Sequence, residues 1–167
     1  LSGRCFTFDQ RADGMGRGEA CSTVLLEDAE VQTSVSGAMV RQDGRSASLT
    51  APNGPAQLGL FNAVMSAASV GINGPGWYEA HGTGTKLGDP IEMRSYSAAV
   101  TGRGCVSVGS LKATTGHTEG ASGLPGLLRA ALTLGTRTTF PNAQLRVVSS
   151  HVAAVLSQSV CLPVQAG

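Results

Sequence analysis

Two segments of the chain share one pattern, in which a short apolar strand leads into a glycine-rich loop with a histidine and then into a helix. The first joins GWYEA (76–80) to EAHGTGTKLGDPIE (79–92), and the second joins CVSVGSL (105–111) to GSLKATTGHTEGASG (109–123). Strands that alternate with helices predict an α/β fold of layered sheet and helices. Sites in such folds gather at the carboxyl ends of the strands, where both histidines fall.

Composition narrows the class of protein. Glycine supplies 23 of the 167 residues, about twice its usual ~7% share, which predicts many tight turns and close backbone approaches. A net charge of +1 and 4% aromatic residues give little basis for binding nucleic acid or an anionic membrane. No run approaches the ~18 apolar residues of a membrane span, and no signal peptide is visible. We expect an intracellular, cytoplasmic protein, with a targeting segment ahead of Leu1 left open.

The first third of the chain is predicted from local patterns. Residues 3–20 are turn-rich and indicate a surface loop. Residues 20–27 and 31–40 are rich in Val, Thr and Ser, which predicts two strands joined tightly through DAE (28–30). Residues 41–57 indicate a long loop.

Three helices are predicted from start signals and apolar spacing. Pro55 suits the first turn of a helix that would run to about Ser69. Asp89 would be the N-cap of a second helix, with Pro90 at its first position and Glu92 at its third, and TGRG (101–104) would end it. GLLRAALTLG (126–135) is apolar nearly all round, which predicts a helix buried in a layered core.

The remaining motifs exclude several kinds of site. The four cysteines are Cys5, Cys21, Cys105 and Cys161. They form no CxxC pair and are interpreted as reduced thiols packed as small hydrophobic residues. The three histidines lack the spacing of a helical zinc site, so no metal is predicted. The chain has neither the GK[ST] ending of a phosphate loop nor the GxSxG of a serine hydrolase.

The loop at His81 is suited to a narrow ligand. Gly82 and Gly84 let the backbone turn sharply and leave room for a ligand against it. Thr83 and Thr85 add hydroxyls that suit an amide-bearing thread. A lone histidine in such a turn is more often a capping or core residue, but the matched second loop favours a catalytic role.

In that second loop, Lys112 precedes His117 and Gly116 allows a turn immediately before the imidazole. Lys112 can set the local potential or pair with a carboxylate such as Glu119, and the spacing does not decide between these roles and a solvated lysine. The helix after His117 would point its positive end at the loop. Two neutral imidazoles converging on one oxygen would stabilise an enolate or a thioester oxyanion, and one such donor is typically worth ~10²–10³ in rate.

These motifs resemble a known family. EAHGTGTKLGDPIE and GSLKATTGHTEGASG resemble the two histidine motifs of β-ketoacyl synthases, specifically the ketosynthase domains of polyketide synthases. VRQDGRSASLTAPNGPAQ resembles the loop before the first motif, and FTFDQRADGMGRGEA resembles the segment that follows the nucleophilic cysteine. The similarity covers most of residues 3–145.

The resemblance implies a thiolase-like layered αβαβα fold, present here in part, and an acyltransferase that condenses an acyl thioester with malonyl-carrier protein by decarboxylative Claisen chemistry. His81 and His117 would serve decarboxylation and oxyanion stabilisation, with Lys112 in support. Thr83 and Thr85 match the threonines that contact the phosphopantetheine arm. The implied partner is acyl carrier protein, which carries the phosphopantetheine, so no cofactor would bind directly. The intact parent would be a homodimer.

The chain also departs from the family pattern. The family's nucleophilic cysteine lies in a TACSSS-like elbow that is missing here, and Cys5 and Cys21 lack its context. The GFGGTN segment near the family's C-terminus is missing too. Residues 1–167 are therefore interpreted as one partial ketosynthase domain, its middle to C-terminal part, and the chain alone is expected to be inactive.

Two alternatives stay open at this point. The parent could be a non-elongating domain that binds carrier protein or pairs with an active partner, or a decarboxylase without condensing activity. Ala113-Thr114, in place of the family's Ser-Asn, and Pro125, in a helix position, leave the non-elongating alternative open, although the retained His81, Lys112 and His117 favour an active parent. The decarboxylase alternative stays open because it would keep both histidines.

Overall fold

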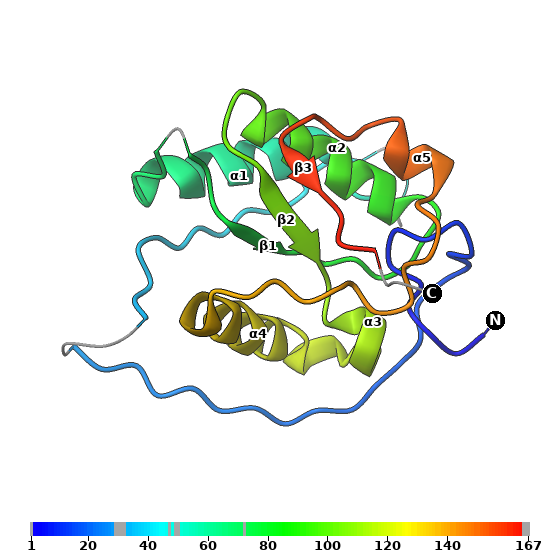
Figure 1. The fold of residues 1–167 in the computed structure, drawn as a ribbon, viewed down its shortest axis with the longest axis horizontal. Helices are drawn as coiled ribbons and strands as arrows, with labels where there is room; N and C mark the ends of the chain where they lie inside the picture. Colours follow the sequence, from blue (N-terminus) through cyan, green and yellow to red (C-terminus); the bar gives the residue numbers. More distant parts are fainter. Residues whose placement is uncertain (1, 29–32, 47, 49–50, 72, 165–167) are drawn as a thin grey trace.

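The chain folds into a mixed α/β structure, as predicted, with helices on both faces of a small sheet (Figure 1). A computed structural model describes residues 2–28, 33–46, 48, 51–71 and 73–164. The sheet contains β1 (Trp77–Glu79), β2 (Val106–Gly109) and β3 (Val160–Cys161), parallel and in that order. The helices are α1 (Gly54–Ala67), α2 (Gly88–Val100), α3 (Lys112–Thr115), the 3-10 helix η1 (Glu119–Ala121), α4 (Gly123–Thr136) and α5 (Ser150–Ala153).

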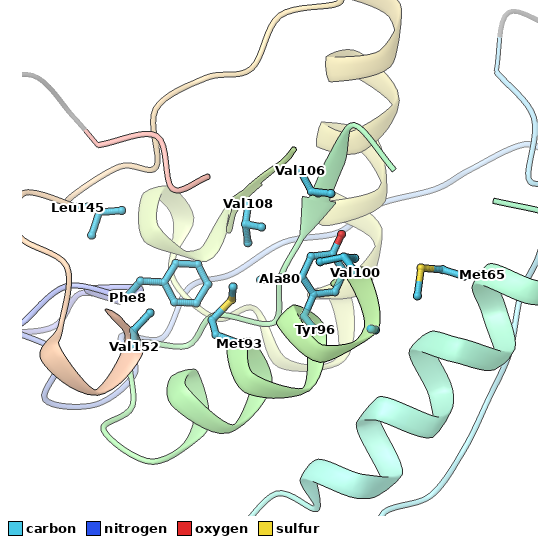
Figure 2. Packing of buried hydrophobic residues seen from close by; sticks show 11 residues of the cluster. Phe8, Met65, Ala80, Met93, Tyr96, Val100, Val106, Val108, Leu145 and Val152 are labelled. Carbon is cyan, nitrogen blue, oxygen red and sulfur yellow. The ribbon is translucent and has the colours of Figure 1, made fainter. Parts of the chain in front are cut away.

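Alternation along the strands assigns one helix layer to each face of the sheet. Val106 and Val108 of β2 are fully buried and belong to the same core as Met93 and Val100 of α2 (Figure 2). On the opposite face, the guanidinium of Arg129 in α4 lies 4.9 Å from the centre of the Trp77 ring. The α1 and α2 pair therefore covers one face, and α4 covers the other.

Aromatic rings join α1 to this arrangement. Tyr78, on the α2 side of β1, stacks on Tyr96 of α2 with ring centres 3.9 Å apart. Phe61 of α1 meets both tyrosine rings edge-on, at 5.5 and 5.3 Å. The helix itself starts as expected around Pro55, because the side chain of Asn53 caps the amide of Ala56 at 3.1 Å.

The two strands predicted in the first third of the chain are absent from its described residues. Residues 20–28 and 33–40 form no strand, and Leu25 and Val40 are 80% and 94% exposed. A β-pattern becomes a strand only when a neighbouring strand pairs with it, and these segments have no such neighbour among the described residues. Residues 29–32, which include most of the predicted DAE link, lie outside the described residues.

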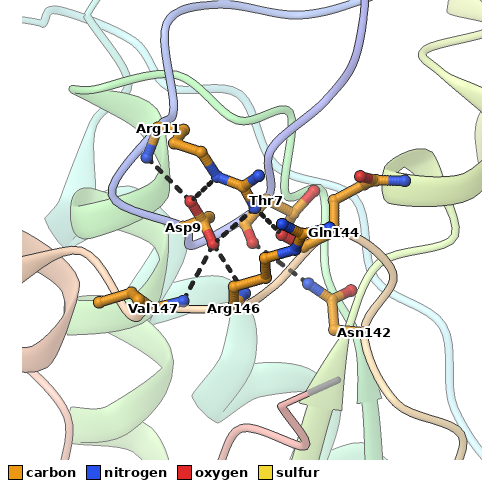
Figure 3. Close-up of polar contacts among 7 residues, drawn as sticks. All are labelled: Thr7, Asp9, Arg11, Asn142, Gln144, Arg146 and Val147. Atoms are coloured by element: carbon orange, nitrogen blue, oxygen red, sulfur yellow. Dashed lines mark hydrogen bonds and ion pairs between the residues drawn. The ribbon is translucent and has the colours of Figure 1, made fainter. Parts of the chain in front are cut away.

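The segment 3–20 is turn-rich, as predicted, but it is not a surface loop. Phe8 and Asp9 are both fully buried, and Phe8 belongs to the main core (Figure 2). A carboxylate can be buried here because several donors bind it: Arg146 N at 2.7 Å, Val147 N at 3.1 Å, and the Arg11 guanidinium (Figure 3). The segment is therefore held against residues 142–148 far along the chain.

Helix α4 matches the predicted helix, but its predicted burial is not seen in this chain. Only Gly126 and Thr133 are buried, while Leu132 and Leu134 are 65% and 60% exposed. Pro125 lies in the first turn of α4, where a missing amide hydrogen costs nothing, so the sequence departure is accommodated. Among the described residues, no helix has both the length and the apolar character needed to cross a bilayer.

The prediction of four reduced, packed thiols is wrong for three of the cysteines. Cys105, just before β2, and Cys161, in β3, are joined in a disulfide. Cys21 is free but exposed. Cys5 alone is a free, buried thiol. The spacing of the cysteines could not show the disulfide, because β2 and β3 become neighbours only in the folded sheet.

Candidate functional site

The structure brings the two histidine loops together. His81 follows β1, and His117 follows α3, which begins just after β2. Since β1 and β2 are parallel neighbours, their carboxyl ends lie side by side and present both loops at one edge. The imidazole rings of His81 and His117 meet edge-to-face, with centres 5.3 Å apart and planes at 86°.

Both rings are neutral at neutral pH. Partial burial lowers the pKa of His81 from its ordinary 6.5, and the charge of Lys112 acts in the same direction against the opposing pull of Glu92. Partial burial and Lys112 likewise lower the pKa of His117. The Nδ1 atom of His117 accepts a hydrogen bond from the amide of Glu119 at 2.8 Å, so the proton of the neutral ring lies on Nε2. This ring can therefore donate an N–H bond.

Lys112 is buried beside the pair. It lines a cavity of about 380 Å³ together with Glu79, His81 and the first turn of α4. Glu119, left open as its partner, instead pairs with Arg17, whose Nε lies 3.3 Å from Glu119 Oε1. No ion pair to Lys112 is found within the described part of the chain. Lys112 acts on the histidines through its charge, and the positive end of α4 faces the same cavity.

The backbone of the first loop is held by the carboxylate of Glu92. This buried side chain accepts the amides of His81 at 2.7 Å and Gly82 at 2.9 Å, and the hydroxyl of Tyr78 at 2.6 Å. From the sequence, Glu92 was predicted only as part of its helix. A glycine-rich loop has free N–H groups that need acceptors, and an acidic residue shortly after it is the signal that could have revealed this contact.

Asp89 holds the other end of the same loop. It is not the N-cap of α2, as predicted, because the helix already begins at Gly88 with Leu87 before it. Its carboxylate accepts the amides of Phe8, Gly84 and Thr85 at 2.9, 3.1 and 3.4 Å. Burial, with a smaller contribution from Glu92, raises the pKa of Asp89 to about 7 against the effect of these hydrogen bonds.

Glu79 joins the two loops. It ends β1, its Oε1 accepts the amide of Leu111 at 2.6 Å, and its Oε2 lies 3.6 Å from Arg129 Nη1. Burial raises the pKa of Glu79, although the Leu111 amide and Arg129 both oppose this. Glu79 was not predicted as a site residue, because its contacts come from Leu111, between β2 and α3, and from Arg129 of α4.

The backbone of the N-terminal segment binds the backbone of His117 through two hydrogen bonds, which form a main-chain clamp. The amide of His117 donates to Gly16 O at 2.7 Å, and its carbonyl accepts from Gly18 N at 3.0 Å. Arg17 and His117 thus face each other in a parallel bridge. Gly18 is required here, because a Cβ at this position would collide with the carbonyl oxygen of Thr115. No local sequence pattern predicts this contact.

Thr83 and Thr85 contact each other within the loop. Their hydroxyl oxygens are 3.5 Å apart, and Thr85 Oγ1 also accepts the amide of Gly88 at 3.1 Å. Neither threonine lines the cavity beside Lys112. A larger apolar cavity of about 810 Å³ lies between α1 and α2, and neither His81 nor His117 lines it.

Cys5 has the properties of a structural thiol. Its Sγ donates to Gly16 O at 3.4 Å, beside the clamp on His117. Burial raises the pKa of the Cys5 thiol, which keeps it protonated and poorly nucleophilic.

Comparison with known proteins supplies the wider context. Residues 32–146 match the family model "Beta-ketoacyl synthase, C-terminal domain". The chain is 42% identical over 141 residues, 78% of its length, to a phenolphthiocerol/phthiocerol polyketide synthase of Mycobacterium tuberculosis. It is 36% identical over 160 residues, 90% of its length, to the highly reducing polyketide synthase otaA of Aspergillus carbonarius. The chain spans only 6% of the length of each of these relatives.

Solved structures give the same fold. The ketosynthase from module 6 of the bacillaene synthase of Bacillus subtilis superposes with a TM-score of 0.80 at 27% identity, covering 98% of this chain and 32% of that one. The ketosynthase from module 1 of the bacillaene synthase of Bacillus amyloliquefaciens superposes with a TM-score of 0.84 at 23% identity, covering 97% of this chain and 31% of that one. The thiolase-like layered fold, present here in part, is thereby confirmed.

Proposed function

Because the chain belongs to the β-ketoacyl synthase family, we propose that it forms part of a polyketide ketosynthase, an acyltransferase that condenses an acyl thioester with malonyl-carrier protein. The single observation that carries this proposal is the edge-to-face pair of neutral imidazoles, His81 and His117, at the carboxyl ends of two parallel strands. Two neutral imidazoles this close can both serve as N–H donors to one oxygen, which suits a reaction whose negative charge develops on a thioester oxygen.

In this mechanism the malonyl thioester loses CO₂, and the electrons of the broken C–C bond form an enolate. His81 and His117 donate to the enolate oxygen, with the proton of His117 on Nε2. The enolate carbon then attacks the carbonyl of the acyl thioester, and the thiolate that held the acyl group leaves. Lys112 keeps both rings neutral by disfavouring a second positive charge nearby.

The partner in this proposal is an acyl carrier protein, which delivers its thioesters on a phosphopantetheine arm. The arm is narrow and carries amides, and the hydroxyls of Thr83 and Thr85 offer it hydrogen bonds from the loop that follows β1. The intact parent is proposed to act as a homodimer. Residues 1–167 alone are proposed to be inactive, since Cys5 is a protonated, buried thiol and Cys21, although exposed, lacks the sequence context of the family's nucleophile.

The proposal is tested with the full-length protein that contains this chain, given malonyl-carrier protein and an acyl thioester. We expect release of CO₂ together with a β-ketoacyl product, whereas residues 1–167 alone should yield neither. Release of CO₂ without a condensed product would favour the decarboxylase alternative. If the full-length protein released no CO₂ and formed no condensed product, the proposal would be refuted. That result would favour a carrier-binding partner without activity.

Lys112→Met should move the acid limb of the decarboxylation pH profile to higher pH. The neutral imidazoles are the donors, so activity falls as pH drops through the lowered pKa values of His81 and His117. Removing the positive charge of Lys112 raises both pKa values, and the loss then begins at higher pH. The measurement is the decarboxylation rate across mildly acidic to neutral pH.

Lys86→Met is the matched control, since Lys86 is exposed and is the only other lysine of the chain. Its profile should follow that of the unmodified protein. An acid limb that stays in place in the Lys112 variant, or moves to lower pH, would contradict the electrostatic role of Lys112.

A further inference from the structure

We propose that Asn142 is a positioning residue that holds the two histidine loops in register, an inference that rests on the proposed function. Asn142 is fully buried although it is polar, and it lies in the segment between α4 and α5. Nothing in the two histidine motifs points to it. Figure 3 shows its side chain directed toward Thr7, beside the Asp9 cluster.

Both ends of the Asn142 amide are used. Its Oδ1 accepts the amide of Ser110 at 2.9 Å, and its Nδ2 donates to the carbonyl of Thr7 at 3.2 Å. One partner is a donor and the other an acceptor, so the side chain must supply one acceptor and one donor within the same plane. Aspartate supplies only acceptors at neutral pH, and leucine, of similar shape, supplies neither.

The two partners of Asn142 lead directly to the catalytic loops. Ser110 Oγ donates to the carbonyl of His81 at 3.4 Å and accepts the amide of Lys112 at 3.3 Å. Thr7 Oγ1 donates to the carbonyl of Gly82 at 2.5 Å. The approach is close, because a Cβ on Gly82 would lie 2.6 Å from Thr7 Cγ2 and 2.7 Å from Ser110 Cβ.

Asn142 therefore fixes the distance between two supports of the same loop. Ser110 approaches the His81–Gly82 backbone from the end of β2, and Thr7 approaches it from the N-terminal segment. The main-chain amide of Asn142 also donates to Pro163 O at 2.9 Å, which ties the same point to the chain beyond β3. A small shift of either support would move His81 relative to Lys112 and His117, and such shifts are costly for catalysis.

The test is Asn142→Asp in the full-length protein, followed as malonyl decarboxylation against pH. At neutral pH the aspartate places a charged oxygen against the Thr7 carbonyl, and we expect the rate to fall by about tenfold relative to the unmodified protein. At mildly acidic pH the carboxyl gains a proton and can again donate to Thr7. The ratio of variant to unmodified rates should therefore rise toward acid. Asn62→Asp, at an exposed position of α1, should give a flat ratio near unity.

Hydrogen exchange separates this inference from the proposed function. In the Asn142→Asp variant at neutral pH, peptides covering 79–85 and 109–117 should exchange faster, and this should reverse at mildly acidic pH once intrinsic exchange rates are taken into account. This result would support the inference even if the full-length protein had no decarboxylase activity. Exchange in both peptides equal to that of Asn62→Asp would overturn it, whatever the activity.

A second pair of variants keeps the inference testable if the aspartate variant does not fold. Thr7→Val removes the hydroxyl bond to Gly82 but keeps the carbonyl that Asn142 binds. If both residues act through the same loop, Thr7→Val combined with Asn142→Leu should lose less decarboxylation activity than the product of the two single losses. Fully multiplicative losses would show that Asn142 acts elsewhere.

Discussion

Replacing His117 with alanine is expected to lower malonyl decarboxylation by the full-length protein by about 10²–10³-fold, the usual effect of losing one preorganised oxyanion donor. His117 is the better-defined donor of the pair, because its Nδ1 accepts the Glu119 amide and its proton is thereby fixed on Nε2. In the proposed mechanism, acylation of the nucleophilic cysteine does not form this enolate, so acylation should remain largely intact. The two steps are measured separately, as CO₂ release and as covalent acyl loading.

His151→Ala is the control, because His151 lies in α5 and is exposed. It should retain both steps. Loss of acyl loading with normal CO₂ release in the His117 variant would reverse the role assigned to this residue.

Asp9→Asn is expected to lower the free energy of local unfolding of the N-terminal segment by about 2–4 kcal/mol. This lies toward the low end of the effects seen when a buried ion pair is broken, because Arg11 is partly exposed. Burial alone would raise the pKa of Asp9. The hydrogen bonds from Arg11, Arg146 N and Val147 N outweigh it and hold the pKa well below its ordinary value of 3.8. The measurement is hydrogen exchange of peptides covering 5–18 and 142–149 in the full-length protein.

The pH dependence of this effect has a definite sign. The folded pKa of Asp9 lies below the unfolded value, so its stabilisation is present above 3.8 and is lost as pH falls below that value toward the folded pKa. The asparagine variant should lack this acid-sensitive component. Asp13→Asn, at an exposed position of the same segment, should behave like the unmodified protein. Equal local stability of the two variants would contradict the structural role of Asp9.

The elements that could be predicted are those whose signals are local. The strand before His81, the strand before Lys112 and the three long helices all follow from apolar runs and turn residues close in the sequence. The two strands predicted in residues 20–40 failed because a strand depends on a partner strand that no local pattern specifies. The prediction that α4 is buried was wrong for a related reason. A helix is buried on every side only when a second layer of structure packs on the side away from the sheet.

The residues of the candidate site likewise fall into those with a local sequence signal and those whose partners lie far along the chain. The histidines and Lys112 were predicted because glycine-rich loops after strands have a recognisable pattern. Glu79 and Asn142 were not, because each acts on a loop far along the chain: Glu79 on Leu111, and Asn142 on Thr7. Asp89 and Glu92 lay inside the first motif but were assigned to a helix start. Their actual role is to bind the backbone amides of the loop before them.

The clamp on His117 depends on the number of residues between 14 and 18, and not on the side chains of residues 15 and 17. Gly16 and Gly18 hold the histidine through main-chain atoms alone, while the neighbouring side chains of Met15 and Arg17 are 46% and 77% exposed. The side chains of Met15 and Arg17 can therefore vary widely in polarity and size while the imidazole keeps its place. An insertion or deletion of one residue between 14 and 18 would instead put the wrong amide and carbonyl opposite His117. For anyone redesigning or recombining this protein, the number of residues in this segment and its glycines at 16 and 18 must be kept, whereas the identities of residues 15 and 17 are free to change.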